Sequence, residues 1–116
     1  MKSIKHMVQN ITVNELSEHL SSPAPSKPFL VDVREDSEVA VSALPFDLHI
    51  PLGLLSERYR EIPSDREIVV YCKAGGRSAK AAGFLLQNGF DPSKVKNLEG
   101  GITQWAAVVE PGMPVA

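Results

Sequence analysis

The segment from Glu67 to Ser78 constrains the fold of this chain more than any other, because an apolar run leads into a glycine-bearing loop and then into a helix-forming stretch. The run Ile68–Tyr71 is β-branched and aromatic and too short for a helix, so it predicts a central strand. After Ser78, alanine, phenylalanine and leucine recur three and four positions apart, which predicts a helix. The only cysteine of the chain, Cys72, lies where the predicted strand ends.

The loop after this strand has the composition of an anion-binding site. A loop that leads into a helix faces unpartnered backbone N–H groups and the positive end of the helix dipole. Gly75 and Gly76 allow the backbone to curl so that more N–H groups point inward. Lys73 and Arg77 add positive charge. A thiol held there is stabilised as a thiolate, so we expect Cys72 to be a nucleophile that needs no separate general base. The alternative is a buried structural cysteine at a strand end.

Four short motifs, in order along the chain, resemble those of one enzyme family. The active loop of the rhodanese family of sulfurtransferases has the pattern Cys-x-x-Gly-x-Arg-Ser, and this chain has Cys72-Lys73-Ala74-Gly75-Gly76-Arg77-Ser78. The other similar segments are Leu30–Glu35, His49–Leu52 and Leu98–Trp105. The resemblance extends from about Ile11 to the C-terminus. Residues 41–46 depart from the Gly-His-Ile-Pro-Gly-Ala stretch of the family, which affects a loop outside the catalytic segment.

Strands alternate with helices along the chain, which predicts an α/β fold with an open, mostly parallel sheet and helices on both faces. The resemblance implies a five-stranded sheet of the rhodanese type. In such sheets ligands bind beyond the carboxyl ends of the strands, where Cys72 lies. The expected strands are 29–33, 47–50, 68–71 and 95–98. The expected helices are 13–20, with a capping box of Thr12 and Glu15, then 38–44, 54–62, a helix after Ser78, and 102–109.

The resemblance implies persulfide chemistry at Cys72. The thiolate would take a sulfane sulfur from a donor such as thiosulfate or a protein persulfide and pass it to a thiophilic acceptor. The persulfide anion would be held by the N–H groups of the residues that we expect to bind substrate, namely Lys73, Ala74, Gly75, Gly76, Arg77 and Ser78. Lys73 would attract an anionic donor. Arg77 would anchor the loop or complement the anion, and the Ser78 hydroxyl would serve the persulfide or cap the helix.

Two charged residues close the second predicted strand. Asp32 ends an apolar run, and burying a carboxylate without a partner costs several kcal/mol. We therefore expect Asp32 to brace the structure at the carboxyl edge of the sheet, near the active loop. Arg34 would add to the positive field there. For both residues, direct contact with substrate remains open alongside this supporting role.

Three other functions fit parts of the pattern. Cysteine phosphatases and arsenate reductases use Cys-x5-Arg, whose wider ring fits a tetrahedral oxyanion, whereas this chain has Cys-x4-Arg. A rhodanese-like module that binds a partner without turnover is a non-enzymatic alternative. The segments around Cys72 and Trp105 also resemble the rhodanese domains fused to adenylyltransferases of molybdopterin and thiamin biosynthesis. Those domains give sulfur to a ubiquitin-like carrier protein, so the chain is either such a domain or a free-standing one.

Length and composition limit the remaining possibilities. A chain of 116 residues is one domain, which we place at residues 11–116, with residues 1–10 as a tail or linker. The net charge of -2 argues against a nucleic-acid partner.

No apolar run is long enough to span a membrane, and a single cysteine fits a reducing compartment, so we expect a cytoplasmic protein. The cysteine and three histidines lack metal-ligand spacing, and we expect no metal or cofactor.

Overall fold

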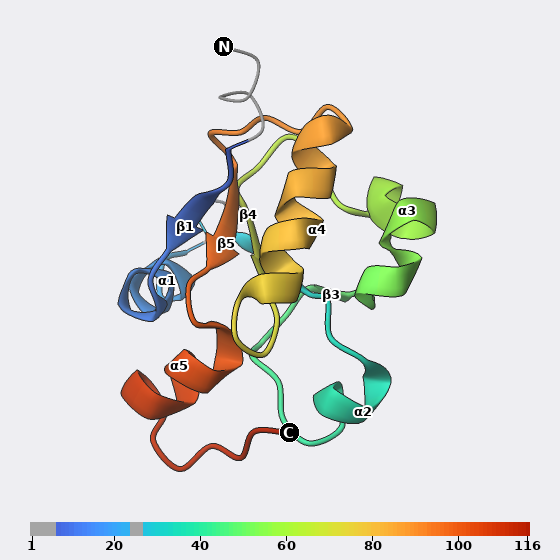
Figure 1. The fold of residues 1–116 in the computed structure, drawn as a ribbon. Coiled ribbons are helices and arrows are strands. Elements are labelled where there is room, and N and C mark those ends of the chain that lie inside the picture. The colour runs from blue at the N-terminus through green and yellow to red at the C-terminus, as the bar shows by residue number, and fades with distance from the viewer. Residues whose placement is uncertain (1–6, 24–26) are drawn as a thin grey trace.

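A parallel β-sheet of five strands forms the centre of the molecule (Figure 1). The computed structural model describes residues 7–23 and 27–116. The strands are β1 (Gln9–Ile11), β2 (Phe29–Asp32), β3 (Leu48–His49), β4 (Ile68–Tyr71) and β5 (Val95–Leu98). They lie in the order β1-β5-β4-β2-β3, and every neighbouring pair is parallel. This confirms the predicted α/β architecture and puts β4, the strand before the cysteine, in the middle of the sheet.

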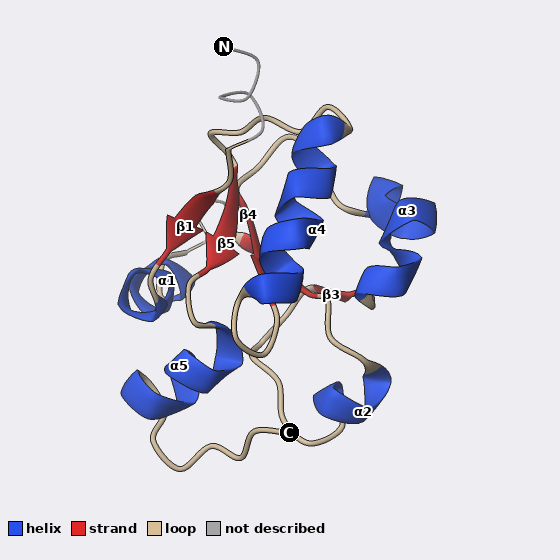
Figure 2. Cartoon of the chain, viewed as in Figure 1, coloured by secondary structure: helices blue, strands red, loops and turns tan. Residues whose placement is uncertain are grey.

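Helices cover both faces of the sheet (Figure 2). The α-helices are α1 (Val13–Leu20), α2 (Asp36–Val39), α3 (Leu55–Arg58), α4 (Gly76–Gln87) and α5 (Gly101–Val108), and the 3-10 turns are η2 (Leu52–Leu54) and η3 (Tyr59–Glu61). Figure 1 shows α3 and α4 on one side of the sheet, with α1 and α5 on the other.

The sequence of β4 explains how both faces are buried. Successive side chains of a strand point to opposite faces. Ile68 and Val70 therefore join the core under α4, whereas Val69 and Tyr71 join the core under α1 and α5. All four residues are buried, which is why the strand reads as an uninterrupted apolar run.

Several predicted elements agree closely with the structure. Helix α1 begins after Thr12, whose hydroxyl accepts from the Glu15 N–H at 3.1 Å, while Glu15 accepts from the Thr12 N–H at 2.9 Å. The predicted capping box is therefore confirmed. Trp105 packs inward from α5 as expected, with 6% of its surface exposed. Within residues 7–23 and 27–116, no helix combines the length and apolar character that crossing a membrane requires.

The sheet begins earlier than the sequence predicted. Gln9 and Asn10, assigned above to a tail, form β1 with Ile11 and pair with β5. A three-residue strand with one buried side chain carries too little pattern to be recognised, and β5 supplies the pairing that stabilises it. The rest of that predicted tail, residues 1–6, lies outside the described residues, as do residues 24–26 of the predicted loop at 21–28.

Two predicted helices were wrong in extent. The helix expected at 38–44 is the single turn α2. It begins at Asp36 because Glu35 is the N-cap residue, and its N–H donates a hydrogen bond to the Glu38 side chain at 2.9 Å. It ends before Ser42, whose carbonyl oxygen instead accepts from the Arg34 guanidinium at 2.7 Å. The helix expected at 54–62 is divided into η2, α3 and η3, because i to i+3 hydrogen bonds tighten both of its ends.

Candidate active site

Cys72 lies directly after β4, at the carboxyl end of the central strand. The loop that follows turns into α4, which begins at Gly76, two residues before the predicted start at Ser78. Gly75 takes the N-cap position with φ +107°, a left-handed conformation that favours glycine. The cysteine is therefore held at the N-terminus of a 12-residue helix by a turn that needs the glycine at this position.

Three groups that can donate a hydrogen bond lie around the Cys72 sulfur. The Gly75 N–H lies 3.1 Å from Sγ, the Ser78 N–H 3.4 Å and the Ser78 hydroxyl 3.3 Å. Burial alone would raise the pKa of the thiol, but these hydrogen bonds, together with the Ala74 N–H, outweigh it and hold the pKa below its usual value. Cys72 itself is 1% exposed, whereas Lys73, Ala74 and Gly76 of the same loop are exposed.

Backbone N–H groups at the start of α5 fix the orientation of the loop. The Ile102 N–H donates to the Cys72 carbonyl and the Thr103 N–H to the Lys73 carbonyl, both at 3.0 Å. In a trans peptide the C=O and the following N–H point in opposite directions. Drawing the Lys73 carbonyl toward α5 therefore turns the Ala74 N–H toward the sulfur. Gly101 permits this approach, because a Cβ there would lie 2.5 Å from both carbonyl oxygens.

Arg77 is tied to a distant part of the chain. Its Nη1 and Nη2 donate to Oε1 and Oε2 of Glu38 in α2, at 2.7 and 2.8 Å. Hydrogen bonding to Arg77 lowers the pKa of Glu38 from 4.5 to about 2, so the carboxylate is ionised at neutral pH. Of the two roles that the sequence left open for Arg77, this geometry favours anchoring of the loop over contact with an anionic donor.

Ser78 connects the cysteine to the sheet. Its side chain is fully buried, and its oxygen lies 3.3 Å from Cys72 Sγ and 2.5 Å from Oδ1 of Asn97 in β5. The Asn97 amide nitrogen in turn donates to Asn10 Oδ1 in β1 at 3.1 Å.

Sequence reasoning missed four residues around the loop: Glu38, Asn97, Asn10 and Gly101. Gly101 had a usable signal, since two consecutive glycines before a helix indicate a close backbone approach. Asn97, next to Leu98 in the predicted strand 95–98, was a second signal, because a polar side chain that a strand buries needs a partner.

Asp32 and Arg34 form a buried pair beside β4. Both are 0% exposed, and the Arg34 guanidinium donates to Asp32 at 2.9 to 3.2 Å. The expectation that Arg34 adds to a positive field at the loop does not fit this pairing, because Asp32 neutralises its charge. The pair ties the end of β2 to the segment after α2, through the bond from Arg34 to the Ser42 carbonyl.

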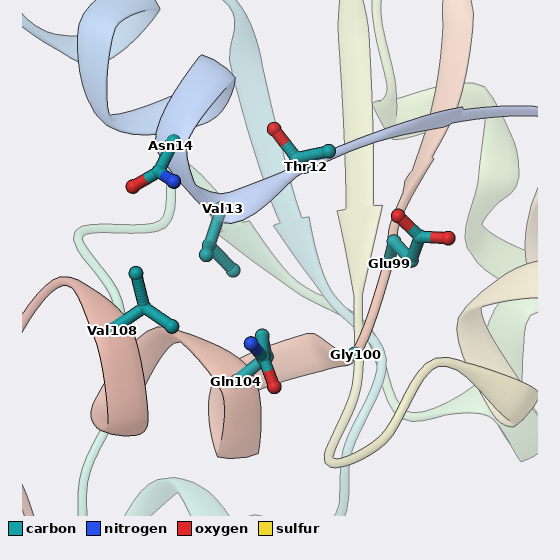
Figure 3. Close-up of a pocket in the computed structure, with 7 residues that line it drawn as sticks. All are labelled: Thr12, Val13, Asn14, Glu99, Gly100, Gln104 and Val108. Carbon is teal, nitrogen blue, oxygen red and sulfur yellow. The ribbon is translucent and has the colours of Figure 1, made fainter.

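A hollow of about 350 Å³ lies between the start of α1 and α5 (Figure 3). Its lining comes from Thr12, Val13, Asn14, Glu99, Gly100, Gln104 and Val108. It contains none of the loop residues 72–78. The groups around the sulfur, two main-chain N–H groups and the Ser78 hydroxyl, are therefore not part of this hollow.

Comparison with known proteins identifies the family. The family model named rhodanese-like domain matches residues 12–108, which is most of the chain. The chain belongs to the rhodanese-like domain family. A rhodanese-like domain protein from Staphylococcus aureus, of known crystal structure, is 29% identical with a TM-score of 0.77, and the match covers 94% of this chain and 99% of that one. The resemblance predicted from the four motifs is confirmed.

Relatives of this rhodanese-like domain include both single-domain and larger proteins. A sulfurtransferase of Allochromatium vinosum is 38% identical over 109 residues, which cover 94% of this chain and 95% of the relative. The adenylyltransferase and sulfurtransferase uba4 of Ogataea parapolymorpha is 30% identical over 108 residues, which cover 92% of this chain but 26% of the relative. The domain thus matches a short sulfurtransferase along nearly its whole length and a larger protein over one part.

Proposed function

We propose that this rhodanese-like domain is a sulfurtransferase that carries a sulfane sulfur on Cys72. The observation that carries the proposal is the group of donors around Sγ, which comes from Gly75, Ser78 and Ala74. Such a group stabilises a sulfur anion without a general base. The name of the Allochromatium vinosum relative supports the same class of reaction.

The first half-reaction transfers sulfur from the donor to the enzyme. The Cys72 thiolate attacks the outer sulfur of thiosulfate and forms a new S–S bond. The S–S bond of the donor breaks, and sulfite leaves with the bonding electron pair. The product is a Cys72 persulfide that carries one negative charge. The loop N–H groups point toward Sγ and so stabilise the attacking thiolate, and the charged outer sulfur of the persulfide lies one S–S bond away from Sγ.

The second half-reaction returns the cysteine to its starting state. A nucleophile such as cyanide or a thiolate attacks the terminal sulfur of the persulfide. The enzyme's S–S bond breaks, and the electron pair remains on Sγ as the thiolate. Cyanide gives thiocyanate, and a thiolate gives a new persulfide. A donor that is itself a protein persulfide enters the first half-reaction in the same way and leaves as a thiolate.

A ubiquitin-like sulfur carrier is the acceptor that we propose for a physiological role. The match to part of the adenylyltransferase and sulfurtransferase uba4 supports this proposal, since the sequence also resembles the rhodanese domains that are fused to adenylyltransferases and give sulfur to such carriers. Lys73, Ala74 and Gly76 of the loop are exposed, so an incoming carrier protein can contact them.

The test is the mass of the protein after incubation with a donor. We expect an increase of one sulfur atom on Cys72 with thiosulfate or with a persulfide, and its loss with formation of thiocyanate when cyanide is added. Cys72→Ser should gain no sulfur, and the wild type should not hydrolyse an aryl phosphate. A protein that takes sulfur from neither donor would overturn the proposal and leave the non-catalytic binding module. Aryl phosphate turnover would instead favour the phosphatase.

A further inference from the structure

The Ser78 hydroxyl faces two acceptors but has one proton to give. Cys72 Sγ lies 3.3 Å from the hydroxyl oxygen, and Asn97 Oδ1 lies 2.5 Å from it. A hydroxyl donates a single hydrogen bond, and an amide oxygen only accepts. The proton therefore lies on one contact or the other. Since 2.5 Å is at the short end of O–H···O distances, the resting arrangement has the hydroxyl donating to Asn97.

Asn97 is held firmly in this position. Its backbone pairs with Val70 of β4 on one side and with Asn10 of β1 on the other. Its side-chain nitrogen donates to Asn10 Oδ1, which leaves Oδ1 of Asn97 turned toward Ser78. Asn97 is 6% exposed and Ser78 is 0% exposed, so solvent cannot readily replace either partner.

We propose that Asn97 is a positioning residue that competes with the Cys72 sulfur for the Ser78 proton and so limits how strongly the loop holds a sulfur anion. This inference rests on the proposed role of Cys72 as the sulfur carrier. When Cys72 is a neutral thiol, its S–H donates to Ser78 and the hydroxyl donates to Asn97, so all three groups are satisfied. When the sulfur becomes an anion, the hydroxyl must leave Asn97 to reach it.

The competition has a function in a ping-pong reaction. Donation from the hydroxyl stabilises the Sγ thiolate, which makes the thiolate form more readily but attack the donor more slowly. The hydroxyl returns to Asn97 while Sγ is bonded to the outer sulfur, and it donates to Sγ again when the acceptor takes that sulfur and Sγ leaves as a thiolate. No covalent bond changes in this exchange. The Ser78 O–H bond rotates, so its hydrogen bond passes from one acceptor to the other, and the fold keeps both acceptors in place.

The experiment measures the rate of alkylation by iodoacetamide against pH in the full chain. Because Cys72 is the only cysteine, the midpoint of this profile reports on that thiol alone. Asn97→Ala removes the competing acceptor, so the midpoint should move to lower pH and alkylation near pH 6 should rise by about fivefold, as for one hydrogen bond of ordinary strength. Asn97→Asp keeps the acceptor and adds negative charge, so its midpoint should move to higher pH.

The decisive experiment repeats both Asn97 substitutions in a protein that also carries Ser78→Ala. If Asn97 acts through the hydroxyl, Asn97→Ala should have no further effect in a Ser78→Ala protein, and the shift caused by Asn97→Asp should become smaller there. Asn88→Ala, an exposed position at the end of α4, is the control for a general effect of losing an amide and should leave the profile unchanged.

Three results would overturn the inference: an unchanged midpoint in Asn97→Ala, a shift to higher pH, or an equal shift with and without Ser78. If Asn97→Ala fails to fold, Asn97→Asp with and without Ser78 decides the question. Failure of the proposed function is distinguishable, since a protein that takes no sulfur from a donor can still show the expected alkylation profiles.

Discussion

Arg77 and Glu38 lie 39 residues apart in the chain and form a bidentate ion pair, with guanidinium nitrogens 2.7 and 2.8 Å from the two carboxylate oxygens. The pair fastens the active loop to α2, on the side away from α5. The loop is thus held from two directions, by backbone donors of α5 at its first two carbonyl groups and by Glu38 near its end. A loop restrained at both ends keeps its N–H groups aimed at the sulfur.

Removing the charge of Glu38 tests this restraint. Glu38→Gln should lower the free energy of unfolding by about 0.5 to 1 kcal/mol at neutral pH, the range of partly exposed ion pairs. Because the pair lowers the pKa of Glu38 from 4.5 to about 2, its contribution is complete above pH 4.5 and disappears as the pH falls toward 2. Urea unfolding of both proteins across this interval measures the difference.

Glu61→Gln is the matched control, since it removes the partner of Arg58 in a more exposed pair. It should cost less than Glu38→Gln and leave sulfur transfer unchanged. A difference between wild type and Glu38→Gln that stays constant from neutral pH down to pH 2 would contradict the pairing.

Gly101→Ala should damage the site most among the glycine substitutions outside the loop. Its φ is +58°, and a Cβ would lie 2.5 Å from the Cys72 and Lys73 carbonyl oxygens. We expect the free energy of unfolding to fall by about 2 kcal/mol. In the molecules that still fold, alkylation of Cys72 should be slow, because the N–H groups of the loop turn away from the sulfur. Gly53→Ala, which meets nothing within 4 Å, is the control. Normal alkylation in Gly101→Ala would refute the orienting role of α5.

Cys72 should become reactive at lower pH when the protein is folded than when it is unfolded. The hydrogen bonds from Ser78, Gly75 and Ala74 lower the pKa of the thiol despite its burial. As the pH rises, the thiolate therefore appears earlier in the folded chain. The measurement is the alkylation profile of the native protein against that of the same protein in urea. Coincident profiles, or a native midpoint at higher pH, would show that burial outweighs the loop donors.

Breaking the Asp32–Arg34 pair should affect stability and not chemistry. Arg34→Met leaves the Asp32 carboxylate buried without its partner, which costs about 3 to 5 kcal/mol. Replacing Asp32 by Asn in the same protein should restore part of this loss, since no uncompensated charge remains. Chemical denaturation measures both, and the folded protein should transfer sulfur at the normal rate. A specific loss of transfer in fully folded Arg34→Met would instead indicate contact with substrate.

The sequence determined the local parts of this protein. The strand Ile68–Tyr71, the curled loop and the following helix could be predicted because β-branched residues, glycines and helix formers act over a few positions. The capping box of Thr12 and Glu15 is equally local, since its two hydrogen bonds join residues three apart. These features sufficed to put Cys72 at a helix N-terminus and to indicate the family.

Only the tertiary structure decided what surrounds that cysteine. Glu38 reaches Arg77, Asn97 reaches Ser78 and Gly101 reaches the Cys72 carbonyl across gaps of 19 residues or more, and no local pattern records which of many polar or small residues will meet. The same reason hid β1, whose three residues are a strand because β5 lies beside them. Short-range preferences let the backbone of the loop curl, whereas long-range packing orients the loop and supplies the partners that hold it.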